Sequence, residues 1–335
     1  MAIRVAINGF GRIGRMVFRA TVDRGNPLEI VALNDLGSPM ELAYLLRYDS
    51  VHGTWNRNIT ADDQQIYVDG KAYKCLKVGD PSQAPWRDLG VDIVLETSGR
   101  FRDKASCLKH LDSGARKVIV GAPGKGMDAT FVMGVNDDQY DPMKHHIVSN
   151  ASCTTNCLAP IVRVLHDRFG VEHGLMTTIH SYTMDQRLLD SLHKDLRRAR
   201  AAALSMVPTT TGAATAVAEV IPELKGKLDG MAIRVPTPNV SIVDVVCRVE
   251  TEVTAETVNQ ALKQAAEGHM KGILRYVDEE LVSVDFNHST YSSCVDAPLT
   301  KVIEKRMVKV LSWYDNEYGY SNRLVDLALH MGKQL

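Results

Sequence analysis

The cysteine at position 153 lies at the junction of two patterns. Residues 146–148 are strand-like and residues 158–169 are helix-like. A helix N-terminus offers unpaired backbone N–H groups and the positive end of the helix dipole, and both stabilise a thiolate over a thiol. Cys153 is therefore a candidate nucleophile. On this segment alone, Cys153 and Cys157 could equally be buried small side chains, or a two-cysteine redox or metal half-site. No second cysteine pair completes a zinc site, so we expect no metal.

A histidine that could serve as the base follows 27 positions later. His180 ends the apolar, strand-like run 175–179. A histidine at a strand end is often a satisfied core residue, but beside a thiol at a helix start it is a candidate for removing the thiol proton at neutral pH. The sulfur would then attack an aldehyde. With a nicotinamide cofactor, the hemithioacetal can lose hydride and leave a thioester.

A glycine-rich loop near the N-terminus indicates where such a cofactor binds. The sequence Gly-Phe-Gly-Arg-Ile-Gly follows an apolar strand at 3–7 directly and opens a helix at 12–24, which is the context of a dinucleotide-binding loop. Glycines let the backbone approach a pyrophosphate, and the helix N-terminus supplies N–H donors. The predicted cofactor contacts in this loop are Gly9, Gly11, Arg12, Ile13 and Gly14.

An acidic residue ends the second strand, at 29–33, about twenty residues further on. The Asp35 carboxylate can accept hydrogen bonds from the adenosine ribose hydroxyls, and it would repel a 2′-phosphate. The order of strand, glycines, helix and acid therefore predicts NAD in preference to NADP.

The composition is that of an ordinary globular protein. The 335 residues contain 39 Lys and Arg against 40 Asp and Glu, a formal net charge of -1, so no global field recruits nucleic acid or an acidic membrane. No run of about 18 apolar residues could span a bilayer, and we identify no signal peptide. Six irregularly spaced cysteines argue against a disulfide framework and favour the cytoplasm.

The order of elements predicts an α/β protein with two domains. Up to about residue 150, apolar runs alternate with helical patterns, as in βαβ units on a largely parallel Rossmann sheet. Ser38 and Pro39 are predicted to begin a helix that extends to about residue 46. From Gly174 onward, long strand candidates predict an α+β domain with a mixed, largely antiparallel sheet. A charged segment, 182–203, has the composition of a solvated helix, and 316–335 is helical and could pack back onto the first domain.

Six segments resemble the phosphorylating glyceraldehyde-3-phosphate dehydrogenases, and the resemblance extends over nearly the whole chain. They are Asn-Gly-Phe-Gly-Arg-Ile-Gly-Arg (8–15), Ser-Asn-Ala-Ser-Cys-Thr-Thr-Asn-Cys (149–157), His-Ser-Tyr-Thr (180–183), Pro-Thr-Thr-Thr-Gly-Ala-Ala (208–214), Arg-Val-Pro-Thr-Pro-Asn-Val (234–240) and Trp-Tyr-Asp-Asn-Glu-Tyr-Gly (313–319).

The resemblance implies phosphorylating oxidation of D-glyceraldehyde 3-phosphate to 1,3-bisphosphoglycerate with NAD, in glycolysis or gluconeogenesis. It implies an NAD-binding domain at 1–150 with the helix 316–335, and a catalytic and oligomerisation domain at 151–315. Cys153 would be the nucleophile, and His180 its base. A homotetramer is implied, and 182–203 becomes an ordered loop near a neighbouring subunit's cofactor.

Further site residues carry over from the family position by position. Thr183 and Arg234 fall on the site for the substrate phosphate, and Asn316 on the asparagine that orients the nicotinamide amide. The residues that fall largely on the site for attacking inorganic phosphate are Ser152, Thr154, Arg198, Thr211 and Gly212. Hydroxyls, backbone donors and an arginine fork are the groups that phosphate oxygens need.

Three departures from the family concern the cofactor. Ser191-Leu192 stands where NAD-specific bacterial relatives usually have Leu-Pro, which leaves room near the ribose and makes some NADP tolerance conceivable. Gly121 and Gly79 replace a serine and an arginine that many relatives carry.

Two rival functions stay open. Erythrose-4-phosphate dehydrogenase shares the cysteine and histidine, and residues 284–288 resemble that branch, but Thr183 belongs to the triose-phosphate site. A non-catalytic NAD-binding or RNA-binding relative is the other rival. The near-zero net charge gives no excess of positive charge that would indicate RNA binding, and no nucleic acid partner is required.

Overall fold

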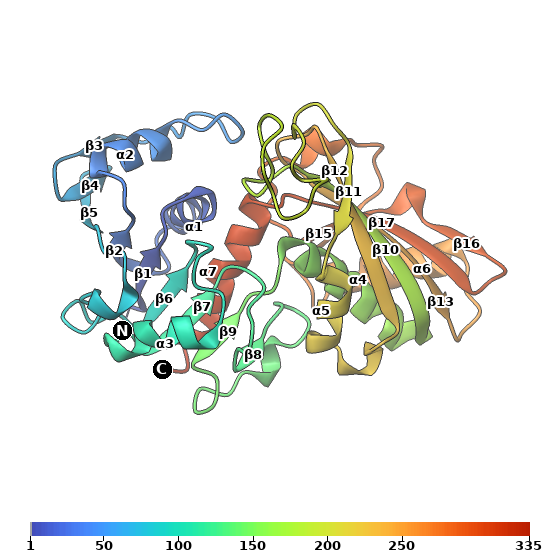
Figure 1. The fold of residues 1–335 in the computed structure, drawn as a ribbon. Helices are drawn as coiled ribbons and strands as arrows, with labels where there is room; N and C mark the ends of the chain where they lie inside the picture. Colours follow the sequence, from blue (N-terminus) through green and yellow to red (C-terminus); the bar gives the residue numbers. More distant parts are fainter. Residues whose placement is uncertain (1) are drawn as a thin grey trace. The chain divides into compact units, whose positions relative to one another are not determined.

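The computed structural model describes residues 2–335, which divide into two compact units (Figure 1). Unit 1 contains the chain up to Phe131, then Asp137–Ala151 and Ser321–Leu335. Unit 2 contains Val132–Asn136 and Ser152–Tyr320. Each unit has its own sheet.

Unit 1 is built on a nine-stranded sheet in the order β3-β4-β5-β2-β1-β6-β7-β9-β8. From β5 to β8 each neighbouring pair is parallel, whereas β3, β4 and β5 form antiparallel pairs. The chain moves outward from β1 to β2 and then returns to the other side of β1 with β6, which is the doubly wound order of a Rossmann domain. The strands are β1 (Arg4–Asn8), β2 (Glu29–Asn34), β3 (Ile59–Ala61), β4 (Gln65–Val68), β5 (Lys71–Leu76), β6 (Ile93–Glu96), β7 (Lys117–Val120), β8 (Ala129–Thr130) and β9 (Ile147–Ser149).

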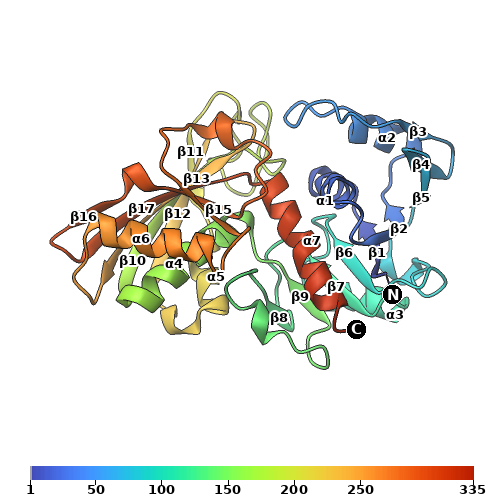
Figure 2. The ribbon, with the colours of Figure 1, turned by 180° about the vertical axis from the view of Figure 1, so that it is seen from behind.

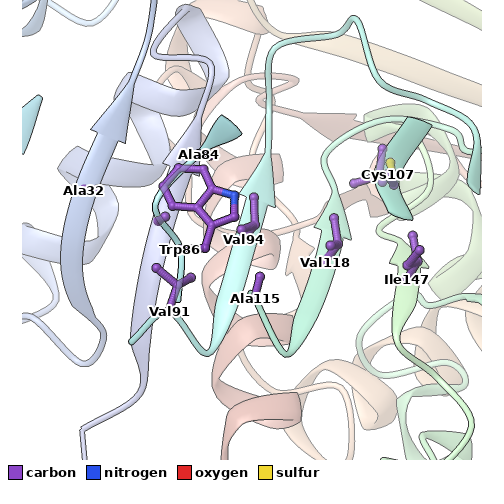
Figure 3. Packing of buried hydrophobic residues seen from close by; sticks show 11 residues of the cluster. Ala32, Ala84, Trp86, Val91, Val94, Cys107, Ala115, Val118 and Ile147 are labelled. Atoms are coloured by element: carbon purple, nitrogen blue, oxygen red, sulfur yellow. The ribbon is translucent and has the colours of Figure 1, made fainter. Parts of the chain in front are cut away.

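Burial on both faces explains why the central strands are apolar. Strands β6 and β7 are buried at every position, as expected for a parallel sheet that helices cover on both sides. In one core cluster, Trp86 packs with Val91 and Val94 beside Val118 (Figure 3). The helices of this unit are α1 (Arg12–Asp23), α2 (Pro39–Arg47), α3 (Lys104–Asp112) and most of α7 (Tyr318–Gly332).

Two helices of unit 1 show how the sequence sets their position. Ser38 Oγ accepts the Glu41 N–H and the Glu41 carboxylate accepts the Ser38 N–H, a capping box that confirms the predicted start of α2. The C-terminal helix α7 packs on the rest of the unit, where Arg24 forms an ion pair with Asp326 (2.6 Å).

Unit 2 contains an eight-stranded sheet, in the order β11-β12-β10-β13-β17-β15-β14 with β16 paired to β17. Two pairs are parallel, β10 with β12 and β14 with β15, and the others are antiparallel, which confirms the predicted mixed sheet. The strands are β10 (Val171–Ser181), β11 (Val207–Thr210), β12 (Leu228–Val235), β13 (Ser241–Val249), β14 (Leu274–Val277), β15 (Ser293–Asp296), β16 (Lys301–Ile303) and β17 (Met307–Tyr314).

Helix α4 (Cys153–Phe169) packs on this sheet, with α5 (Ala213–Val220) and α6 (Ala255–Glu267) beside it (Figure 2). Its buried side chains include Leu158, Ile161 and Leu165. The helix is thus buried along most of its length, and Cys153 is its first residue.

Segment 182–203 forms no helix. It consists of turns held by backbone hydrogen bonds, such as Ser191 N–H to Ala199 C=O (2.9 Å) and Ala202 N–H to Arg187 C=O (2.8 Å). The segment is therefore a loop, as the family resemblance implies, and the helix suggested by its charged composition is not formed. Its position near a neighbouring subunit's cofactor stays a prediction. Across residues 2–335, we find no helix with both the length and the apolar character needed to cross a membrane.

Candidate active site

The turn before α4 places Cys153 at the first position of the helix. Ala151 has a left-handed backbone (φ 56°), a conformation that costs a non-glycine residue about 1 kcal/mol. Ser152 then caps the helix, since its Oγ accepts the Thr155 N–H (3.0 Å). The sharp turn and the cap fix the backbone at the start of the helix, and Cys153 stays partly accessible to solvent.

The structure brings Cys153 and His180 together, as the sequence predicts. Cys153 Sγ lies 3.5 Å from His180 Nε2, within hydrogen-bonding reach of sulfur. His180 Nδ1 lies 2.7 Å from the Ser181 carbonyl. The carbonyl can only accept, whereas Arg234 Nη1, 2.9 Å from the same ring nitrogen, can only donate, so the contacts alone fit either tautomer. In the tautomer with the proton on Nδ1, Arg234 Nη1 donates to the Ser181 carbonyl (3.0 Å) and Nε2 presents its lone pair to the sulfur. The ring is therefore oriented as a base for the thiol.

Burial and the neighbouring Arg234 charge shift the pKa values of both Cys153 and His180. Desolvation raises the pKa of the Cys153 thiol, while the Arg234 charge and hydrogen bonds from Thr154 lower it. Desolvation and the Arg234 charge lower the pKa of His180 to about 3. His180 is therefore uncharged near neutral pH and free to take a proton, and Arg234 favours the thiolate that results.

Arg234 lies beside His180 because their strands pair in register. His180 on β10 and Arg234 on β12 are directly paired residues. Arg234 Nη1 lies 2.9 Å from His180 Nδ1, 3.0 Å from the Ser181 carbonyl and 3.4 Å from Thr183 Oγ1. Its Nε is buried and has no hydrogen-bond partner within residues 2–335. A buried guanidinium with an unused donor, next to a threonine hydroxyl, fits an anion such as a phosphate.

Arg198 lies in the loop between β10 and β11 and is tied to β11. Its Nε donates to Thr209 Oγ1 (3.0 Å) and its Nη2 to the Thr210 carbonyl (3.2 Å), and Nη1 forms an ion pair with Asp185. Burial alone would raise the pKa of Asp185, but hydrogen bonds from Arg198 and His193 lower it. The sequence reasoning missed Asp185 as the carboxylate partner of Arg198.

The remaining predicted phosphate residues lie at two helix starts. Ser152 and Thr154 flank Cys153 at the start of α4, and the Thr154 hydroxyl bonds the Tyr314 hydroxyl (2.8 Å). Gly212 caps α5, and Thr211 Oγ1 accepts the Ala213 N–H (3.2 Å). Both helix starts offer backbone donors suited to an anion.

Asn316 is almost fully buried in unit 2. Its Oδ1 lies 2.9 Å from Ser181 Oγ and 2.8 Å from Ser241 Oγ. These serine contacts hold the amide in one place. The side chain is thus fixed next to the residue that follows His180.

Unit 1 contains a second site, built on the glycine loop. Gly9 has φ 93°, and a Cβ there would lie 2.3 Å from the Ser98 Cα. A Cβ on Gly14 would lie 2.1 Å from the Gly9 carbonyl oxygen, whereas one on Gly11, at the start of α1, meets no atom within 4 Å. Gly9 and Gly14 are therefore required for packing, and Gly11 leaves open the space at the helix N-terminus.

Arg12 and Ile13 are the first two residues of α1. Unlike the loop glycines, Arg12 has a side chain that bonds another residue of unit 1. The Arg12 guanidinium bonds both carboxylate oxygens of Asp49 (2.9 and 3.2 Å). Burial would raise the pKa of Asp49, but hydrogen bonds from Arg12 and from backbone N–H groups lower it well below its usual range. The Arg12 side chain is thus held on the protein by Asp49.

A pocket with a volume of ≈ 240 Å³ opens beside the glycine loop. Asp35 lies at its edge, and the carboxylate accepts the Phe10 N–H (2.7 Å) and the Leu36 N–H (2.7 Å). The lining residues are Asn8, Gly9, Gly11, Asn34, Asp35, Leu36, Val78, Gly79, Thr97, Ser98, Arg100 and Phe101. A glycine-bounded pocket with one carboxylate at the end of β2 fits the adenosine half of NAD.

The departures at Gly79 and Gly121 have different surroundings. A Cβ at Gly79 would meet one atom within 4 Å, in Leu36, so the glycine widens the pocket. A Cβ at Gly121 would lie 3.1 Å from Thr97 and 3.2 Å from Leu324, so a serine there would need its neighbours to move.

Substituting the loop glycines one at a time should separate packing from binding. We expect Gly9→Ala to destabilise the protein by roughly 2 kcal/mol or more, because its Cβ would overlap backbone atoms. Gly11→Ala should keep its stability within about 0.5 kcal/mol, yet weaken NAD binding at least about tenfold by occupying the space at the helix N-terminus. Thermal unfolding and NAD titration of both variants check this. Normal NAD binding by Gly11→Ala would contradict the assignment of the loop.

Tyr314 is the main residue of the cysteine site that sequence reasoning missed. Along β17 the buried positions alternate as Val308, Val310, Ser312 and Tyr314. That alternation is visible in the sequence and would have placed the tyrosine inward at the strand end. Its hydrogen-bond partners were not predictable, because they come from separate elements.

Cys157 packs in the core, as the sequence analysis allowed. It is fully buried, and its Sγ lies 3.5 Å from Ser293 Oγ and 3.6 Å from the Ser312 carbonyl. Burial raises the pKa of its thiol to about 12. Cys157 is therefore a protonated packing residue.

Comparisons with known proteins agree with this geometry. The family model for the NAD binding domain of glyceraldehyde 3-phosphate dehydrogenase matches residues 3–104, and the model for its C-terminal domain matches residues 152–316. The chain is 59% identical to glyceraldehyde-3-phosphate dehydrogenase of Geobacillus stearothermophilus over 335 residues, covering 100% of this chain and 99% of the relative. It is 57% identical to glyceraldehyde-3-phosphate dehydrogenase 1 of Bacillus subtilis, covering 100% of this chain and 99% of the relative. The chain therefore belongs to the glyceraldehyde-3-phosphate dehydrogenase family.

Proposed function

We propose that this protein oxidises D-glyceraldehyde 3-phosphate to 1,3-bisphosphoglycerate, with NAD as the hydride acceptor and inorganic phosphate as the second substrate. The observation that carries the proposal is the Cys153–His180 pair at 3.5 Å, with Arg234 beside it, in a chain 59% identical to a glyceraldehyde-3-phosphate dehydrogenase over its whole length. The reaction belongs to glycolysis and gluconeogenesis.

The chain's own residues account for each step at the sulfur. His180 Nε2 removes the Cys153 proton, and the sulfur bonds to the aldehyde carbon to give a hemithioacetal. The Cys153 backbone N–H and the His180 imidazolium stabilise the developing oxyanion. NAD supplies the hydride acceptor when bound, held by the glycine loop, Asp35 and Asn316. His180 gives its proton to the oxyanion to form the hydroxyl and takes the same proton back as hydride leaves, and the carbon becomes a thioester.

The second half of the reaction regenerates the thiolate. A phosphate oxygen attacks the thioester carbon, the carbon–sulfur bond breaks, and the acyl phosphate departs. Thr183 and Arg234 hold the phosphate of the triose. The attacking phosphate is bound mainly by Ser152, Thr154, Arg198, Thr211 and Gly212. The unused buried Nε of Arg234 and the donors at the two helix starts support these assignments.

The two domains divide these tasks. Residues 1–150 with the helix 316–335 bind NAD, and residues 151–315 carry out catalysis and oligomerisation. The compact units support this division, although they place 132–136 and 316–320 with the catalytic unit. The enzyme works in the cytoplasm, where its six free cysteines stay reduced.

We also propose a homotetramer. The loop 182–206 exposes large apolar side chains, among them Leu188 (86%), Leu192 (92%) and Leu196 (82%). Such a concentration of exposed apolar side chains is typical of an interface. Sedimentation velocity should give the mass of four chains, and a monomer would contradict the proposal.

One assay tests the function. NADH formation should require glyceraldehyde 3-phosphate and inorganic phosphate together. Faster oxidation of erythrose 4-phosphate, independent of phosphate, would instead indicate the erythrose-4-phosphate branch. NAD binding without formation of a thioester would indicate a non-catalytic relative.

Cofactor choice gives a further prediction. We expect NAD to be preferred over NADP, because the Asp35 carboxylate would repel a 2′-phosphate. Asp35→Asn should lower the ratio of the NADP dissociation constant to the NAD dissociation constant by about tenfold. NAD itself should also bind more weakly, since an amide cannot accept both the Phe10 and the Leu36 N–H groups. Fluorescence titration of both cofactors measures the ratio, and a wild type that prefers NADP would contradict the assignment.

A further inference from the structure

Three buried hydroxyls form a connected chain behind the cysteine. Tyr314 Oη lies 2.8 Å from Thr154 Oγ1 and 2.9 Å from Thr178 Oγ1. All three side chains are nearly inaccessible to water, with exposures of 2%, 4% and 1%. Groups so deeply buried keep these bonds because no water can replace them.

The chain joins the two elements that hold the catalytic pair. Thr154 follows Cys153 in the first turn of α4, and Thr178 lies on the same face of β10 as His180, two residues before it. Tyr314 comes from β17, which the strand β13 separates from β10 in the sheet. Its ring also packs edge-on against His180, with centroids 5.9 Å apart. One side chain therefore contacts both the helix start and the base.

Each hydroxyl has a single proton, so the chain has a direction. If Thr178 donates to Tyr314, then Tyr314 donates to Thr154, the residue that follows Cys153 in α4. Hydrogen bonds in such a series polarise and strengthen one another.

We propose that Tyr314 is a positioning residue for the reaction: its hydroxyl, bonded to Thr154 and Thr178, fixes the start of α4, and with it Cys153, against the strand that carries His180. The inference rests on the proposed function, because it concerns the reactivity of the same thiol. The other charged or titratable groups that face this thiol are Arg234 on β12 and His180 on β10.

The test is the rate at which iodoacetamide alkylates Cys153 in the full-length protein, followed by mass spectrometry from pH 5 to 10. Tyr314→Phe keeps the ring against His180 and removes only the hydroxyl. We expect alkylation at pH 7 to slow about tenfold and to rise more steeply between pH 6 and 10, because the sulfur is no longer held beside its base. NAD affinity should be unchanged, and kcat should fall more than KM rises.

Tyr140→Phe is the matched control. Tyr140 is also buried, and its hydroxyl has no partner among the described residues, so its removal should change neither the profile nor the rate. Thr178→Val breaks the outer bond without altering Tyr314 and should reproduce the slower alkylation. In the Tyr314→Phe background it should add less than a twofold effect, because the chain is already broken.

The outcomes are distinguishable. If wild-type Cys153 reacts no faster than an ordinary thiol, the proposed function fails. If the wild type reacts fast and a folded Tyr314→Phe reacts within twofold of it, only the positioning role is overturned. If Tyr314→Phe does not fold, Thr178→Val decides the question in the same assay.

Discussion

Replacing Cys153 with serine is expected to lower aldehyde oxidation by about 10⁴-fold or more while NAD binding persists. A serine hydroxyl has a pKa far above that of a thiol, so it stays protonated throughout the working pH range and is a much weaker nucleophile than the thiolate. An ester also transfers its acyl group to phosphate less readily than a thioester. The loss should therefore affect both halves of the reaction.

Cys157→Ser is the matched control for this substitution. It makes the same change one turn further along α4, at a side chain with hydroxyl and carbonyl neighbours at 3.5 and 3.6 Å. We expect it to lose roughly 1 kcal/mol of stability at most and to keep its activity. Stopped-flow NADH formation measures the rate, and fluorescence titration measures NAD binding. Oxidation by Cys153→Ser within tenfold of the wild type would show that another group carries the acyl intermediate.

The dinucleotide site was predictable because it is local in the chain. Strand β1, the glycine loop and α1 are consecutive, and the alternation of apolar runs with helical spacing marks them directly. The predicted boundaries agree with the structure to within one residue at Arg4 and Asp23. The hairpin of β3 and β4 was missed, because its strands are only three and four residues long and carry little periodicity.

The cysteine site was predictable only in part. The helix start at Cys153 follows from a strand, a capping serine and an apolar helix in sequence, but the backbone of Ala151 (φ 56°) could not be foreseen for a residue that rarely adopts it. The proximity of Arg234 to His180 depends on the parallel pairing of β10 with β12. Pairing between strands so far apart in the chain is set by the whole sheet, so the family resemblance supplied what local patterns could not.

Composition gave the wrong secondary structure for segment 182–203. Its charges suggested a solvated helix, yet Arg198 and Arg200 are used in ion pairs with Asp185 and Asp190. The Arg198 guanidinium also donates to the Thr210 carbonyl of β11, and the Asp190 carboxylate accepts the Ala201 N–H, so side chains pair with backbone groups in place of helical hydrogen bonds. Charge patterns alone do not distinguish a helix exposed to solvent from a loop held by ion pairs and hydrogen bonds of its own side chains.

The second large effect is expected for His180→Asn. Asparagine keeps a polar side chain of similar reach but has no nitrogen lone pair that can take a proton, so the thiol must ionise unaided. Burial raises the pKa of that thiol, and the Arg234 charge with hydrogen bonds from Thr154 and from the Cys153 backbone only partly opposes the shift. We expect kcat/KM at pH 7 to fall about 10²-fold to 10⁴-fold.

The sign of the pH dependence is the sharper test of the role of His180. In the wild type, His180 is neutral above about pH 3, so its ability to accept the thiol proton is constant from pH 6 to 10. In His180→Asn the thiolate fraction rises tenfold for each pH unit below the thiol pKa. The ratio of wild-type to variant rate should therefore be largest near pH 6 and shrink steadily toward pH 10. Iodoacetamide alkylation and NADH formation should show the same trend, and a ratio that stays constant across this range would show that His180 is not the base that activates Cys153.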